Sequence, residues 1–81
     1  MKARLQVLTI ERVRIGDNLK RWRKYRLMTQ QELADAAELG VASVVRIENN
    51  RTEPRFSTIK KLADALDLEA RQLISERPPN W

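Results

Sequence analysis

The side chains of this 81-residue sequence that could do chemistry are mostly cationic. There are 16 Lys and Arg residues against 11 Asp and Glu residues, which gives a net charge of +5, and the sequence contains neither histidine nor cysteine. It therefore lacks the usual general base, the thiolate nucleophile and the commonest metal ligands. Because we also find no glycine-rich phosphate loop and no paired carboxylates suited to a pocket, we expect neither an enzyme nor a bound cofactor or metal.

The cations are concentrated at the N-terminal end of the sequence. Residues 1–26 hold nine Lys and Arg residues and two acids, whereas residues 27–81 hold seven Lys and Arg residues and nine acids. A basic segment on a small domain favours a polyanionic partner, most often nucleic acid. The alternative is that the charge only keeps the surface soluble, and charge alone does not decide between the two.

Length and hydrophobicity indicate a single domain. A chain of 81 residues, 42% of them hydrophobic, can build one compact core. No apolar run approaches the ~20 residues that span a bilayer, and no secretory signal peptide is apparent, so we expect a cytoplasmic protein without a membrane partner. We divide the chain into an N-terminal arm (residues 1–14), a domain (residues 15–75) and a C-terminal tail (residues 76–81).

The first helix is predicted to follow an ambiguous arm. Residues 1–14 fit a short strand, an extended arm or a disordered tail. Apolar periodicity then predicts a helix from about Gly16, because one face carries Ile15, Leu19 and Trp22 at i, i+4 and i+7.

The next two segments give signals of different strength. Thr29 and Glu32 have the spacing of a capping box, which predicts a short helix that ends near Ala37. Residues 41–48 fit two structures. They are rich in β-branched residues that alternate as in a strand, yet Val44 and Ile47 also have the i, i+3 spacing at which a helix would bury both. Local signals leave this choice open.

The C-terminal half is predicted to form two further helices. Asn49-Asn50 marks a stop, since asparagine tolerates the left-handed conformation at the end of a helix. A helix over about residues 57–66 and a last short one over about residues 69–75 then present an apolar face formed by Ile59, Leu62, Ala63, Leu66, Leu73 and, less clearly, Leu68.

Residues 29–50 meet the packing needs of a helix-turn-helix. The first helix needs a small residue midway, which is Ala34, and an apolar residue must follow the turn, which is Leu39. Val44 and Ile47 can pack the second helix on the first. The start of that helix is small enough to enter a major groove about 12 Å wide, because it consists of Gly40, Val41 and Ala42.

With these features, the sequence resembles the lambda-repressor/Cro-like (XRE-type) helix-turn-helix family over roughly residues 15–74. The matching pieces keep the family's spacing without a gap and are Leu19-x-x-Trp22-Arg23, Thr29-Gln30-x-Glu32-Leu33-Ala34, Arg46-Ile47-Glu48, Pro54 and Leu62-Ala63-x-Ala65-Leu66. The resemblance implies an all-α fold, a compact five-helix lambda-repressor-like DNA-binding domain, in which residues 41–48 are helical. It also implies double-stranded DNA as the partner.

The resemblance fixes the register of the turns. The family's usual turn glycine aligns with Glu38, whereas Gly40 opens the recognition helix, which covers about residues 40–48. Leu27, Asn50 and Asp67 occupy three further positions where the family usually has glycine. A glutamate at positive φ costs roughly 1 kcal/mol relative to glycine. Together these departures from the family pattern predict a less stable domain with the same fold.

The resemblance also implies the roles of individual residues. The predicted base contacts are Val41, Ala42, Val45 and Arg46, of which Arg46 could bind a guanine edge bidentately while the others can meet only thymine methyls or shape. The predicted phosphate contacts are Gln30, Gly40, Ser43, Arg51 and Arg55. The alternatives are that Gln30 is only a favourable first-turn residue, that Arg46 contacts phosphate or an acidic neighbour, and that the loop arginines are merely solvated.

A further pair is predicted to be structural. Arg23 and Glu48 match positions that the family buries as an ion pair between the first and third helices. Removing either partner would leave an unpaired buried charge, which costs several kcal/mol. We therefore expect such a change to unfold the domain before it alters recognition.

Two functions are consistent with these features of the sequence. The first is a transcriptional regulator, a repressor rather than an activator, that binds an operator as a homodimer with half-sites about 34 Å apart. Both the N-terminal arm and the last helix with Trp81 are candidates for the dimer interface. The second is an antitoxin-like or adaptor protein-interaction module, whose Val41, Ala42 and Val45 face would dock on a protein partner.

Overall fold

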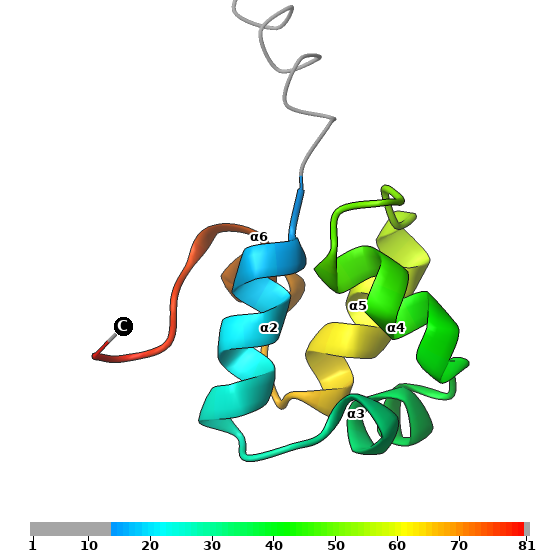
Figure 1. The fold of residues 1–81 in the computed structure, drawn as a ribbon. Coiled ribbons are helices and arrows are strands. Elements are labelled where there is room, and N and C mark those ends of the chain that lie inside the picture. The colour runs from blue at the N-terminus through cyan, green and yellow to red at the C-terminus, as the bar shows by residue number, and fades with distance from the viewer. Residues whose placement is uncertain (1–13, 81) are drawn as a thin grey trace, which may run out of the picture.

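The computed structural model describes residues 14–80, which form five α-helices and no strand (Figure 1). Their bounds are α2 Gly16–Tyr25, α3 Gln30–Ala37, α4 Val41–Glu48, α5 Phe56–Ala65 and α6 Ala70–Ser75. The predicted all-α, five-helix fold is confirmed, whereas the predictions for residues 1–13 of the arm and for Trp81 concern residues outside this range. None of the helices in the described part of the chain is long and apolar enough to cross a membrane.

The start of α3 shows the predicted capping box. The Thr29 hydroxyl accepts a hydrogen bond from the Glu32 backbone N–H at 3.0 Å, and the Glu32 carboxylate accepts one from the Thr29 N–H at 2.8 Å. A related bond begins α6, where the Glu69 N–H donates to the Gln72 side chain at 2.9 Å. These bonds satisfy backbone donors that a helix start would otherwise leave unpaired.

Residues 41–48, which local signals left open, form helix α4. Their β-branched side chains do not prevent this, because helical geometry buries Val44 and Ile47 together against the other helices, with exposures of 0% and 3%. Tertiary burial of an apolar face thus outweighs the local preference for a strand.

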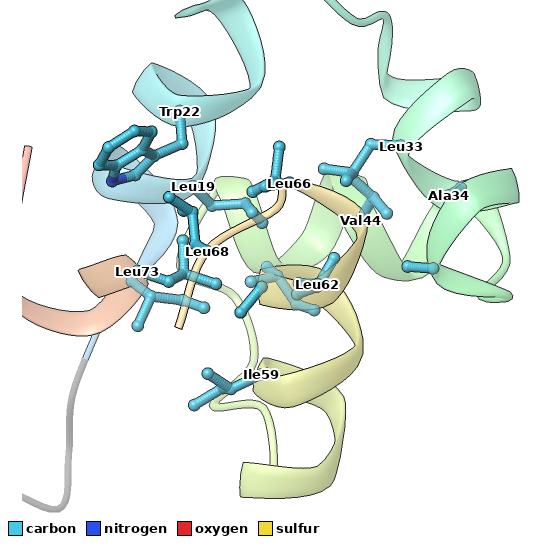
Figure 2. Close-up of a cluster of buried hydrophobic side chains, with 14 residues drawn as sticks. Leu19, Trp22, Leu33, Ala34, Val44, Ile59, Leu62, Leu66, Leu68 and Leu73 are labelled. Carbon is cyan, nitrogen blue, oxygen red and sulfur yellow. The ribbon is translucent and has the colours of Figure 1, made fainter. Parts of the chain in front are cut away.

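One apolar core joins all five helices (Figure 2). Every residue that periodicity placed in the core is buried except Leu39, which is half-buried and packs against the cluster. Ala34 is fully buried, as expected where a second helix crosses closely. The core comprises Ile15, Leu19, Trp22, Leu33, Ala34, Ala37, Val44, Ile47, Ile59, Leu62, Ala63, Leu66, Leu68 and Leu73.

The C-terminal tail also packs on the domain. The indole N–H of Trp22 donates to the Glu76 carbonyl at 2.9 Å, and Pro78 is buried. The side-chain amide of Asn18 donates to the carbonyls of Leu73 and Ile74 near the end of α6, at 3.3 and 3.1 Å. The tail therefore continues the structure beyond its last helix.

Each connection between successive helices turns at a residue of positive φ that is not glycine. These residues are Leu27, Glu38, Asn50 and Asp67, with φ between 56° and 60°, as the register predicted. Gly40 has a φ of −76° and needs no glycine-specific conformation. At every turn the following residue donates its N–H to the carbonyl five residues earlier, at 2.8–3.1 Å, which is the Schellman pattern of helix ends.

A buried ion pair fixes α2 to α4. The Arg23 Nε and Nη2 atoms donate to the two carboxylate oxygens of Glu48 at 2.6 and 3.1 Å, and Arg23 Nη1 donates to the Met28 carbonyl at 2.9 Å. The Glu48 side chain is 1% exposed and that of Arg23 is 11% exposed. Bidentate geometry of this kind is the strongest form of an arginine–carboxylate contact.

The strained turns make a stability prediction. Leu27 has a φ of 59° and is 89% exposed, so its side chain adds strain and almost no packing. We expect Leu27→Gly to raise the free energy of unfolding by about 1 kcal/mol, which corresponds to a melting temperature about 4–8 °C higher. Leu27→Ala, which keeps a Cβ atom, should change little. If alanine stabilised the domain as much as glycine, backbone strain would not be the cause.

The ion pair makes a second stability prediction. Glu48→Ala should lower the free energy of unfolding by about 3–5 kcal/mol, measured by urea denaturation, because it leaves the Arg23 charge buried without its partner. The double variant Arg23→Met, Glu48→Met removes both charges and should recover much of that loss. A double variant no more stable than Glu48→Ala would show that the carboxylate matters for another reason.

Candidate nucleic-acid interface

Helix α4 presents one side to solvent. Its inner side is fixed by the burial of Val44, Ile47 and Glu48. On the outer side, Val41, Ala42 and Arg46 are exposed and Val45 is half-buried. The structure therefore brings the four predicted base-contacting residues onto one surface. We call this surface, formed by Val41, Ala42, Val45 and Arg46, the outer face of α4.

The outer face of α4 is mainly apolar. Three of its four side chains offer only methyl groups, which can meet a thymine methyl or the shape of a groove but cannot hydrogen-bond to a base edge. Arg46 is its one charged side chain, and no carboxylate accompanies it, because the only acid of α4 is the buried Glu48. This face can therefore approach a polyanion without repulsion from an exposed acid of its own helix.

The first turn of α4 has free donors. Gly40 is the N-cap residue and provides no side-chain hydrogen bond to the helix. The first backbone N–H groups that bond within the helix belong to Ser43 and Val44, and both donate to the Gly40 carbonyl. The earlier N–H groups thus remain available at the positive end of the helix dipole, where anions bind readily. A role for Gly40 at a phosphate would use this backbone.

A cleft of about 380 Å³ lies beside the outer face of α4, between that helix and the loop before α5. Arg46 and Arg55 both line it, and Ser43, Thr52, Ser57 and Thr58 add hydroxyl groups. Its remaining lining residues are Leu39, Ile47, Glu53 and Pro54. Two guanidinium groups and several hydroxyls suit a phosphate oxygen. Three predicted contact residues, Ser43, Arg46 and Arg55, thus share one recess.

Arg51 does not line this cleft, although sequence analysis grouped it with Arg55. It lines a second hollow, together with Arg14 at the start of the described chain. Arg14 belongs to the segment assigned to the N-terminal arm, and no local signal linked it to a loop 37 residues away.

Gln30 has a partner that sequence analysis missed. Its side-chain amide donates to Glu48 Oε1 at 3.0 Å, so three donors from two side chains converge on that carboxylate. Gln30 is only partly buried, and an amide group has two N–H donors. One hydrogen is therefore engaged with Glu48 and the other remains for the predicted phosphate contact.

Gly16 and Asn50 form another contact that the sequence did not reveal. The Gly16 N–H donates to Asn50 Oδ1 at 3.1 Å, and a Cβ atom at Gly16 would lie 2.5 Å from the Glu48 carbonyl oxygen. The start of α2 therefore packs directly against the end of α4. The available signal in the sequence was the glycine at the predicted start of the helix, because glycine permits such a close approach.

The exposed side of α3 is acidic and limits where a polyanion can approach. Glu32, Asp35 and Glu38 are all exposed, and α3 carries no basic residue. Asp35 accepts a hydrogen bond from the Gln31 amide at 2.9 Å rather than pairing with a cation. Like charges repel, so a nucleic acid would approach over α4 and the loop after it, with Gln30 at the start of α3 near its edge.

Comparison with known proteins identifies the architecture. The pattern that defines the helix-turn-helix family matches residues 19–73. The immunity repressor protein of Bacillus phage phi105 is 34% identical over 62 residues, which cover 76% of this chain and 43% of that protein. The chain thus spans less than half the length of that relative.

A solved structure is similar over nearly its whole length. The restriction-modification controller protein C.AhdI from Aeromonas hydrophila is 32% identical and superposes with a TM-score of 0.73, covering 76% of this chain and 94% of that one. The sequence match and the shared fold agree with the geometry of α3 and α4. The chain belongs to the XRE-type, lambda-repressor-like helix-turn-helix family, whose members are DNA-binding regulators rather than enzymes.

Proposed function

We propose that this protein is a transcriptional repressor that binds an operator in double-stranded DNA as a homodimer. The observation that carries the proposal is the outer face of α4, which is exposed, free of carboxylates and bordered by the cleft with two arginines. The names of the two relatives, an immunity repressor and a restriction-modification controller, support a regulatory role.

The geometry suggests how contacts would be divided. With α4 in the major groove, Val41, Ala42 and Val45 would meet thymine methyls, and Arg46 would donate to O6 and N7 of a guanine. Arg55 and Ser43 would hold the adjacent phosphates, as would the backbone N–H groups near Gly40 and the remaining amide hydrogen of Gln30; Arg51 would add a contact further along the loop. Phosphate contacts of this kind position the protein, and base contacts specify the sequence.

Homodimerisation follows from the size of the reading surface. One domain offers one recognition helix, and only Arg46 on its outer face can hydrogen-bond to a base. This gives little discrimination between DNA sequences. Two-fold pairing would place two such helices in successive major grooves, with half-sites about 34 Å apart.

The second candidate function is a protein-interaction module, antitoxin-like or an adaptor. The specific observation in its favour is the patch of Val41, Ala42 and Val45, since exposed apolar groups on a helix also suit a protein groove. Such docking would depend weakly on salt, whereas DNA binding falls linearly on a log–log scale as salt rises.

Selection of bound sequences from random duplex DNA tests the proposal. We expect enrichment of two inverted half-sites whose centres lie about 10–10.5 base pairs, or a multiple of that, apart. A single motif without its inverted copy would contradict the homodimer. If no duplex were retained even at low salt, DNA binding itself would be refuted and the interaction module would remain.

A matched pair of arginine variants tests the division of roles. Arg46→Ala should relax preference at one base position and cost about 1–3 kcal/mol on the selected site, with a smaller loss on random DNA. Arg55→Ala should weaken both duplexes alike, because a phosphate contact carries no sequence information. Equal losses for Arg46→Ala on the two duplexes would show that Arg46 contacts only phosphate.

A further inference from the structure

A second polar hollow, of about 360 Å³, lies where the start of α2 meets the loop after α4. Its lining residues are Arg14, Asn50, Arg51, Thr52 and Glu53. We propose that this hollow, called here the arginine hollow, binds a phosphodiester group of duplex DNA beyond the groove that α4 enters. The inference rests on the proposed function and adds Arg14 as a contact residue.

The backbone around the arginine hollow is held in place from both sides. Ile15 is 1% exposed, and the adjacent Gly16 N–H donates to Asn50 Oδ1 at 3.1 Å. On the other side, the Arg51 N–H donates to the Arg46 carbonyl at 2.9 Å. Arg14 and Arg51 therefore project from fixed backbone positions, although both side chains are exposed. A preorganised pair loses less entropy on binding than two arginines on mobile segments would lose.

The charges of the arginine hollow suit an anion. No hydrogen bond or ion pair joins the side chain of Arg14 or Arg51 to another residue between 14 and 80, so both guanidinium groups can donate to a ligand. Among residues 14–80, Glu53 is the one acid that lines the hollow, so two positive charges there stand beside one negative charge. Guanidinium groups match the oxygens of a phosphate bidentately, and a phosphodiester carries a single negative charge, so the net charges are complementary.

The position of the arginine hollow favours DNA as the source of that phosphate. The hollow shares Thr52 and Glu53 with the cleft that holds Arg46 and Arg55. The start of α2 and the loop after α4 lie at the same end of the molecule, whereas the C-terminal tail descends on the far side of α2 from α4 (Figure 1). Two adjoining recesses beside one recognition helix fit neighbouring phosphates of the same strand.

The test measures how binding to a labelled duplex of mixed sequence depends on chloride concentration. Each phosphate contact contributes about 0.9 to the slope of log K against log salt. We expect Arg14→Ala and Arg51→Ala each to reduce the slope by about that amount, and Arg14→Lys to restore most of it. Arg77→Ala, which removes the same charge from the tail, is the matched control and should leave the slope nearly unchanged. Equal melting temperatures would show that the exposed Arg14 is not needed for folding.

Replacing chloride by inorganic phosphate at constant ionic strength distinguishes a free anion from the duplex backbone. We expect this replacement to affect duplex binding by the wild-type protein and by Arg14→Ala equally. A larger effect on the wild-type protein would identify a site for free phosphate and overturn the inference. If the unchanged protein binds duplex but Arg14→Ala behaves like Arg77→Ala, the arginine hollow is refuted and the proposed function stands. If the unchanged protein binds no duplex, both fail.

Discussion

The Glu48 carboxylate is buried at the end of α4 and accepts hydrogen bonds from Arg23 on α2 and Gln30 on α3. Because three helices meet at this one group, it fixes both the position of α4 and its rotation about its own axis. A buried ion pair of this kind need not add net stability over apolar packing, but its geometry is demanding. Its main contribution is orientation. If α4 rotated about its axis, Val41 and Arg46 would no longer point to the side on which DNA is proposed to bind.

The same domain accepts strain at every turn between its helices. Leu27 and Glu38 adopt a left-handed conformation that costs roughly 1 kcal/mol relative to glycine, whereas Asn50 and Asp67 tolerate it better. The cost at Leu27 and Glu38 is appreciable for a domain whose total stability is about 5–15 kcal/mol. The Schellman hydrogen bonds and the shared core overdetermine these turns, so the fold is kept and stability is reduced. The connection between α3 and α4 is therefore set by packing rather than by the intrinsic preference of the residue at the turn.

The sequence predicted a helix correctly where its local pattern agreed with the burial and hydrogen bonding found in the structure. Examples are the capping box at Thr29 and the apolar helix face that includes Leu19. The sequence did not decide residues 41–48, because β-branched residues favour strands locally and only burial against other helices makes them helical. The features of the site that sequence missed join distant residues, such as the hydrogen bond of Gln30 with Glu48 or the hollow that Arg14 and Arg51 both line. Nothing in their local spacing differs from that of solvated polar residues, so three-dimensional structure was needed to find them.

The composition of the outer face of α4 bears on how specificity would arise. One bidentate arginine contact is worth about 1–3 kcal/mol of discrimination, whereas specific sites typically exceed nonspecific DNA by about 4–10 kcal/mol. Arg46 alone falls short of that range, and two copies in a dimer reach about 2–6 kcal/mol. The remainder would come from methyl contacts of Val41, Ala42 and Val45 and from the cost of deforming the DNA to meet both half-sites and the phosphate contacts. With so few polar groups on the recognition helix, most of the selectivity of the proposed dimer would come from the pairing of two subunits and from the sequence-dependent cost of deforming the DNA, while the flanking arginines would position the protein on the backbone.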